Sequence, residues 1–136
     1  MILPLQQANA DVAIKALFDT REFTCLVKNI YYEARGEPVR GQKAVALVTL
    51  NRVASKHYPD TVCGNVYKKH QFTWTANKNR KVTDKKAWAR AEEVAYAVLS
   101  GNHGLGSFKA THFHTKQVSP NWGLKRKAVI GNHIFY

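Results

Sequence analysis

The chain has 136 residues, of which 45% are hydrophobic and 22% charged, as in an ordinary globular protein long enough to bury a core. No apolar run approaches the roughly 20 residues that cross a bilayer, and no signal peptide is visible at the start. The formal net charge of +12 predicts association with a polyanion, such as nucleic acid, anionic lipid or a bacterial envelope. The basic residues are scattered and form no nucleic-acid-binding motif, so no specific nucleic-acid partner is expected.

Helical periodicity accounts for most of the chain. After a loose terminus, Asn9 or Asp11 can cap a first helix whose inward residues are then Ile14, Leu17 and Phe18. The third predicted helix is nearly all apolar in its middle, so we expect it to be the central buried helix. The predicted helices cover residues 9–19, 24–35, 41–55 and 84–100.

The C-terminal part differs in kind from the helical part. Residues 111–115 alternate in polarity, and residues 128–135 predict two short strands around a turn at Gly131 and Asn132. The fold class is therefore mainly α, an α+β arrangement with a short β-hairpin near the C-terminus. The remaining segments, predicted as loops or as ambiguous between strand and irregular structure, cover residues 57–64, 66–74 and 77–83.

Two carboxylates, Glu33 and Glu37, follow an apolar stretch. On a helix Glu33 shares the inward face with Leu26 and Ile30, and Gly36 is expected to end that helix just after it. Burial and the negative end of the helix dipole both favour the protonated acid. A protonated carboxylic acid is what a glycosidase uses to donate a proton to a departing sugar oxygen. The alternative is a partly exposed carboxylate at a helix end that pairs with a neighbouring arginine.

Seven sequence blocks stand out along the chain. They are residues 31–37 (YYEARGE), 41–46 (GQKAVA), 50–53 (LNRV), 58–63 (YPDTVC), 71–74 (QFTW), 119–122 (SPNW) and 130–135 (IGNHIF). Together they resemble the cell wall hydrolase family that includes the spore-cortex-lytic enzymes. The blocks occur in the order of that family, from about Cys25 to the C-terminus.

The resemblance implies a lysozyme-like, mostly helical catalytic domain that spans residues 1–136, with 1–24 as a helical extension before the similar region. It also implies cleavage of peptidoglycan glycan strands at the bond from N-acetylmuramic acid to N-acetylglucosamine, with Glu33 as catalytic acid. Peptidoglycan and the anionic bacterial envelope are then the expected partners of the basic surface.

The number of carboxylates at the site decides the type of reaction. Glycosidases normally use a second carboxylate, and Glu37 is the only one close to Glu33 in sequence. We assign Glu37 a supporting role, in which it binds backbone amides or Arg35. A single acid favours a lytic transglycosylase, in which the C6 hydroxyl of muramic acid attacks and a 1,6-anhydro product forms. Hydrolysis by water, as in an N-acetylmuramidase, remains the alternative.

Aromatic and amide side chains are the candidates for sugar binding. Core packing is the alternative for each aromatic residue, and Asn51 on the apolar third helix is expected to bond a buried backbone group. The candidate substrate-binding residues are Tyr31, Gln71, Phe72, Trp74, His112, His114 and Trp122.

Histidines and cysteines raise two further questions. His112 and His114, with His133 downstream, could hold zinc as in a zinc-dependent wall amidase, but no metal-site motif accompanies them, so no metal and no cofactor are expected. Cys25 and Cys63 allow one disulfide or two free thiols, and related sequences often carry both cysteines. A bridge implies an oxidising compartment.

The small size, high charge and lack of a visible signal peptide resemble an endolysin of a phage that infects Gram-negative bacteria. Such a monomeric enzyme accumulates in the host cytoplasm and then reaches the periplasm and wall; a bacterial wall-remodelling enzyme would be periplasmic or extracellular. The rival classes are the zinc-dependent amidase and a basic nucleic-acid-binding module.

Overall fold

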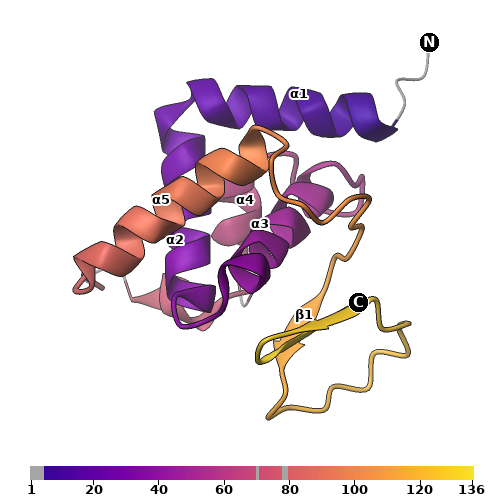
Figure 1. Cartoon of the computed structure of the whole chain (residues 1–136). Helices are drawn as coiled ribbons and strands as arrows, with labels where there is room; N and C mark the ends of the chain where they lie inside the picture. Colours follow the sequence, from indigo (N-terminus) through magenta and orange to yellow (C-terminus); the bar gives the residue numbers. More distant parts are fainter. Residues whose placement is uncertain (1–4, 70, 78–79) are drawn as a thin grey trace.

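The computed structural model describes residues 5–69, 71–77 and 80–136. The first four residues of the predicted loose terminus, and residues 78–79 of the predicted basic loop, lie outside this description. The prediction of a mainly α fold with a small C-terminal sheet is confirmed (Figure 1). The elements are α1 (Leu5–Phe18), α2 (Thr20–Ala34), α3 (Val39–Val53), α4 (Val62–Val66), the 3₁₀ helix η1 (Thr73–Ala76), α5 (Lys85–Leu99), β1 (Phe113–Thr115), β2 (Ala128–Ile130) and β3 (His133–Phe135).

Helix α2 is the element around which the others pack. It begins after Asp19, whose side chain accepts hydrogen bonds from the backbone N–H groups of Arg21 and Glu22. It therefore starts four residues before the predicted position. Leu26 and Ile30 are fully buried against neighbouring helices, and the helix ends at Ala34 as predicted.

Helix α3 is the predicted central buried helix. Every residue from Ala44 to Leu50 is buried. Asn51 makes the contact expected of it, because its Nδ2 donates to the carbonyl oxygens of Phe108 and Ala110 at 3.0 and 2.9 Å. The Asn51 side chain therefore holds the loop that precedes β1 against α3.

Helix α1 lies across α2, α3 and α5 at one end of the bundle (Figure 1). It begins at Leu5 rather than at residue 9. The predicted inward face is partly wrong, because Phe18 is 86% and Ile14 54% exposed, whereas Ala16 is buried. The face of α1 that packs on the bundle is instead centred on Ala16. The short side chain of Ala16 lets the helix pack there without a gap. Within the described residues, no helix is both long and apolar enough to span a membrane.

A short helix, α4, replaces part of the predicted loop. Its backbone N–H groups at Val62 and Cys63 donate to the carboxylate of Glu22 on α2, at 2.6 and 3.2 Å. Thr61 caps the helix by accepting from Gly64 N–H. The sequence prediction missed α4 because its stabilising acceptor lies forty residues away in the chain.

The sheet has the strand order β1-β3-β2, and both strand pairs are antiparallel. The predicted hairpin between β2 and β3 is confirmed, with Gly131 at φ +57° in the turn. Ile130 and Phe135 are buried in a small cluster with Val45 and Val48 of α3. The sheet is thereby fixed to the central helix, on the side of the molecule away from α1 (Figure 1).

Candidate active site

Glu33 lies in the last turn of α2 and is half-buried. Loss of water around the carboxyl group raises its pKa from 4.5 to about 7. The indole of Trp74 and the positive charges of Arg52 and Arg80 oppose this rise without cancelling it. Glu33 is therefore a carboxylic acid that is partly protonated at neutral pH.

Arg52 is the residue of this site that the sequence analysis missed. It lies near the end of α3 and is only 5% exposed. Its Nε donates to the carbonyl oxygen of Thr111 at 2.7 Å, and its guanidinium carbon is 5.2 Å from the ring centroid of Tyr58. A signal was present, because an arginine within an apolar helix requires a partner.

Trp74 borders Glu33 from η1. Its ring is largely buried and faces Tyr32, with ring centroids 4.6 Å apart. Its buried Nε1 makes no hydrogen bond of normal geometry to the described residues, yet its effect on the pKa of Glu33 places it beside that carboxyl group. This N–H is available to an oxygen atom that enters the site.

Two predicted sugar-stacking residues are instead core residues. Phe72 is 6% exposed and stacks between Trp74 and Phe113, so the prediction that its face contacts substrate is wrong. Tyr31 is fully buried, and its prediction is wrong for the same reason. Aromatic residues near a site more often complete the core beneath it than line it. Gln71 is half-buried next to this stack, and its role in binding sugar amides stays a prediction.

The Tyr31 hydroxyl holds the start of α5 onto α2. It accepts from the backbone N–H groups of Thr83 and Asp84 at 3.3 and 3.1 Å, and from Arg35 Nη1 at 2.7 Å. Burial by itself would raise the pKa of Tyr31, but these donors together lower it. Arg35 thus contacts Tyr31, and in the described part of the chain it forms no ion pair with Glu37. Its supporting role in the site stays a prediction.

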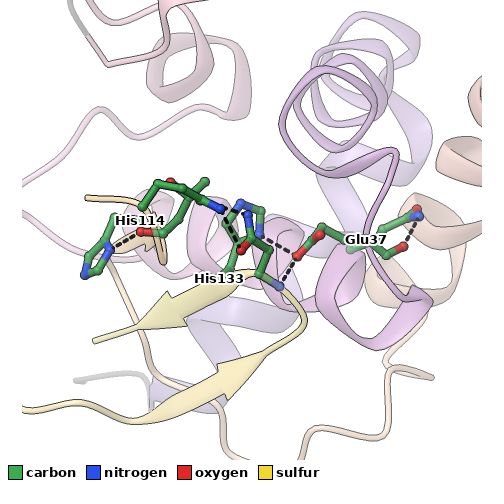
Figure 2. A network of polar contacts seen from close by, with 7 residues as sticks. Glu37, His114 and His133 are labelled. Atoms are coloured by element: carbon green, nitrogen blue, oxygen red, sulfur yellow. Dashed lines mark hydrogen bonds and ion pairs between the residues drawn. The ribbon is translucent and has the colours of Figure 1, made fainter. Parts of the chain in front are cut away.

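Glu37 reaches to the β2–β3 hairpin (Figure 2). Its Oε1 accepts from the backbone N–H of Asn132 at 2.7 Å and lies 3.4 Å from Nδ1 of His133. Burial lowers the pKa of His133, Glu37 raises it, and His114 lowers it further, with a net fall. We call these contacts of Glu37 with Asn132 and His133 the hairpin clamp. A supporting role for Glu37 in the reaction stays a prediction.

His112, His114 and Trp122 gather on the sheet with Tyr136. Trp122 is 41% exposed, and its ring centroid is 5.2 Å from that of His112 and 5.4 Å from that of His114. Burial, Arg52 and Lys127 lower the pKa of His112. The role of His112, His114 and Trp122 in substrate binding stays a prediction. Among the residues that the structure describes, no three His, Cys, Asp or Glu side chains are grouped to hold a metal ion.

Three other carboxylates cap helices. Asp19 caps α2, Asp84 caps α5 through Ala87 N–H, and Glu22 caps α4. In the described part of the chain, the charges that act on the pKa of Glu33 are those of two arginines and include no second carboxylate. The predicted disulfide between Cys25 and Cys63 is confirmed and joins α2 to α4.

The family model for cell wall hydrolases matches residues 36–136, about three quarters of the chain. The chain therefore belongs to the cell wall hydrolase family. It is 32% identical over 124 residues to a spore cortex-lytic enzyme of Oceanobacillus iheyensis, and 32% identical over 123 residues to that of Bacillus subtilis. Each alignment covers 87% of this chain but only 42% and 38% of those relatives, so the chain spans about two fifths of their length.

Two solved structures share the fold. The catalytic domain of the Bacillus cereus SleB protein has a TM-score of 0.70 and 30% identity, over 87% of this chain and 91% of that one. The catalytic domain of the germination-specific lytic transglycosylase SleB from Bacillus anthracis has a TM-score of 0.72 and 29% identity, over 87% of this chain and 95% of that one. The fold described above is thus that of a catalytic domain in these proteins.

Proposed function

We propose that this chain is a lytic transglycosylase that cleaves peptidoglycan glycan strands between N-acetylmuramic acid and N-acetylglucosamine, with Glu33 as the catalytic acid. The observation that carries this proposal is the setting of Glu33: a half-buried carboxyl group with a pKa of about 7, beside an indole and two guanidinium groups. The family membership and the printed activity of the Bacillus anthracis neighbour support the same assignment.

The reaction balances with one carboxyl group. Protonated Glu33 donates its proton to the glycosidic oxygen as the bond from that oxygen to C1 of muramic acid breaks. The C6 hydroxyl of the same muramic acid then attacks C1 and gives its proton to the Glu33 carboxylate. The products are a free 4-hydroxyl end and a 1,6-anhydro ring, no water is consumed, and Glu33 is again protonated. A pKa near neutral suits a group that must serve as acid and then as base.

Attack by water is the alternative outcome. An inverting or retaining hydrolase would need a second carboxylate at about 5–9.5 Å from the acid. The nearest one in sequence, Glu37, is instead bound to the hairpin. This arrangement favours the intramolecular path over an N-acetylmuramidase reaction.

Mass spectrometry of the soluble fragments from purified peptidoglycan, with and without borohydride reduction, tests the proposal. We expect non-reducible 1,6-anhydro-muramic ends, and none with Glu33→Gln. Reducible muramic ends would show that water attacks. Intact glycan with freed peptides would overturn the proposal in favour of an amidase.

The biological setting is a separate part of the proposal. The relatives reported above are spore cortex-lytic enzymes. The high positive charge favours instead a phage endolysin that acts on the host wall. We keep lysis of the host envelope as a prediction. Expression in Gram-negative cells whose inner membrane is then permeabilised should cause lysis, and Glu33→Gln should not.

A further inference from the structure

A cavity of about 210 Å³ opens between α2 and η1, and two of its lining residues, Trp74 and Arg80, act on the pKa of Glu33. It is smaller than the roughly 300–1,000 Å³ of sites for drug-sized ligands, so it suits a single sugar ring with its substituents. We call it the tyrosine pocket. Its lining residues are Lys28, Tyr32, Tyr67, Trp74, Thr75, Asn77 and Arg80.

The walls of the tyrosine pocket are aromatic. Tyr32 is adjacent to Glu33 in sequence, and its ring faces that of Trp74 at 4.6 Å. Tyr67 meets Trp74 edge to face at 6.0 Å and is 46% exposed. Exposed aromatic edges beside a catalytic acid offer the apolar surface on which the C–H faces of a sugar can pack.

Two cations border these aromatic walls. The Arg80 guanidinium carbon lies 4.9 Å from the Tyr32 ring centroid, and the Tyr32 hydroxyl contacts the Arg80 carbonyl oxygen at 3.5 Å. Lys28 lies one helical turn before Tyr32 on α2. Within the described ranges, neither Lys28 nor Arg80 forms an ion pair with a carboxylate of the protein. The charge of Lys28 is therefore available to an anionic ligand, whereas the charge of Arg80 also acts on Glu33, whose pKa it lowers.

We propose that the tyrosine pocket binds a sugar unit that carries a carboxylate, with Tyr32 and Tyr67 against the ring and Lys28 and Arg80 on the carboxylate. This inference rests on the proposed function and specifies its substrate: the unit is a muramic acid next to the bond that Glu33 cleaves. The carboxylate can come from the lactyl group of a peptide-free strand or from an acidic residue of the peptide stem. A neutral N-acetylglucosamine polymer has no such group and is bound less tightly.

Binding to the inactive Glu33→Gln protein tests the pocket without requiring turnover. Trp74 fluorescence or calorimetry at low salt gives Kd for three probes: peptide-free muramyl oligosaccharides, the same fragments with stem peptides, and each of these with its carboxylates converted to methylamides. We expect about tenfold tighter binding of at least one acidic probe than of its amidated form. The probe that shows the preference identifies the source of the carboxylate.

Lys28→Met in the Glu33→Gln background is the decisive variant, because Lys28 lines the pocket and forms no ion pair with a carboxylate of the described residues. It should weaken binding of the preferred acidic probe about tenfold and leave the amidated probe unchanged. Arg80→Met should do the same. Lys81→Met, an exposed neighbour outside the pocket lining, is the matched control and should change neither Kd.

The outcomes separate the two proposals. Equal affinity for acidic and amidated probes, or equal loss on both with Lys28→Met, would overturn the carboxylate site even if anhydro products form. If the Glu33→Gln protein prefers the acidic probes but the parent protein cleaves no glycan, the proposed reaction is overturned and the carboxylate site is supported. A folding defect in Lys28→Met would be visible as a fall in Tm, and Lys28→Gln then replaces it.

Discussion

Two opposing effects bring the pKa of the Glu33 carboxyl group close to neutral pH. Burial raises its pKa by removing water, and the Trp74 indole with the guanidinium groups of Arg52 and Arg80 limits the rise to about 7. With burial alone the pKa would be higher still, so the group would hold its proton and donate it less readily. With the lowering groups alone it would be ionised at neutral pH and could not act as the acid. The balance between them populates both forms.

Replacement of Glu33 by glutamine should abolish cleavage and stabilise the fold above neutral pH. Loss of the acid should cost at least 10²–10⁴-fold in rate. Folding raises the pKa of Glu33 from 4.5 to about 7, so ionisation of Glu33 lowers the free energy of unfolding. This loss of stability is absent below pH 4.5 and complete above pH 7. The cost is on the order of 3 kcal/mol. Glu33→Gln should therefore raise Tm at pH 8 and change it little at pH 4; near-parental cleavage by this variant would remove Glu33 from its role.

The pH profile of cleavage should report the pKa of Glu33. The reaction begins from the protonated acid, so kcat/KM should fall as pH rises above about 7, by about tenfold per pH unit well beyond it. Initial rates on solubilised glycan fragments at constant ionic strength measure this limb. A rate that stays constant to pH 9 would mean that another group donates the proton.

Arg52 should act on both the pKa of Glu33 and the position of the segment before β1. Arg52→Gln removes a charge that lowers the pKa of Glu33, so the basic limb of the pH profile should move to higher pH. It also removes the donor to the Thr111 carbonyl oxygen, at a cost of about 1–3 kcal/mol in the free energy of unfolding. Arg52→Lys keeps the charge and should restore the limb but not the full stability. An unshifted limb in Arg52→Gln would show that the arginine is only structural.

At the scale of elements, α4 is held to α2 by two kinds of bond. The Glu22 carboxylate accepts from the first N–H groups of α4, and the Cys25–Cys63 disulfide lies one turn further along α2. A helix of five residues is too short to be stable by itself. These attachments therefore account for its formation and for its position against α2.

Reduction of the disulfide should lower stability more than it lowers intrinsic activity. The bridge closes a loop of 38 residues, for which the loop-entropy estimate is about 4 kcal/mol. Thermal unfolding with and without a reductant, and of the Cys25→Ser/Cys63→Ser double variant, measures the loss. The reduced protein should retain cleavage activity at a temperature where it stays folded. Unchanged Tm on reduction would contradict this role.

The elements that sequence patterns predicted well are those with local signals. Periodicity and the Gly131 turn located the long helices and the hairpin, because their contacts and dihedral preferences are set within a few residues. Helix α4 depends on the distant Glu22, and the exposure of Phe18 depends on how α1 lies on the bundle. Neither can be obtained from local periodicity.

The candidate site was predictable to a similar extent. A carboxylate at the end of an apolar helix face pointed to Glu33 and to its raised pKa. The sequence could not show that Tyr31 and Phe72 are buried, because an aromatic residue that packs under a site and one that lines it have the same pattern. Arg52 was missed because its partners lie on the loop before β1, far away along the chain.

At the scale of the whole molecule, the net charge of +12 is large for 136 residues. Twenty-one Lys and Arg residues face nine Asp and Glu residues, and several of those acids are engaged as helix caps. The surface is thus positive and suits recruitment to an anionic wall. In the proposed function, the charge acts on encounter with the substrate, whereas the reaction itself depends on the buried groups.

Cleavage of intact walls should therefore fall with added salt. Screening at 0.15–0.5 M should slow wall lysis several-fold by raising KM, with little change in kcat. Lysis of whole sacculi compared with cleavage of short neutralised fragments separates recruitment from chemistry, and the fragments should show the weaker dependence. Equal salt dependence on both substrates would assign the effect to the active site.

The hairpin clamp also sets an order of events during synthesis on the ribosome. Glu37 and Asn132 are 95 positions apart, and Thr111, which holds Arg52, is itself held by the backbone of Tyr136. Helix α2 can form early in translation, but the residues that fix its end and bring Arg52 into place emerge later. A nascent chain therefore carries Glu33 before the groups that tune it are in place. In the proposed function, cleavage then begins only after β3 has paired.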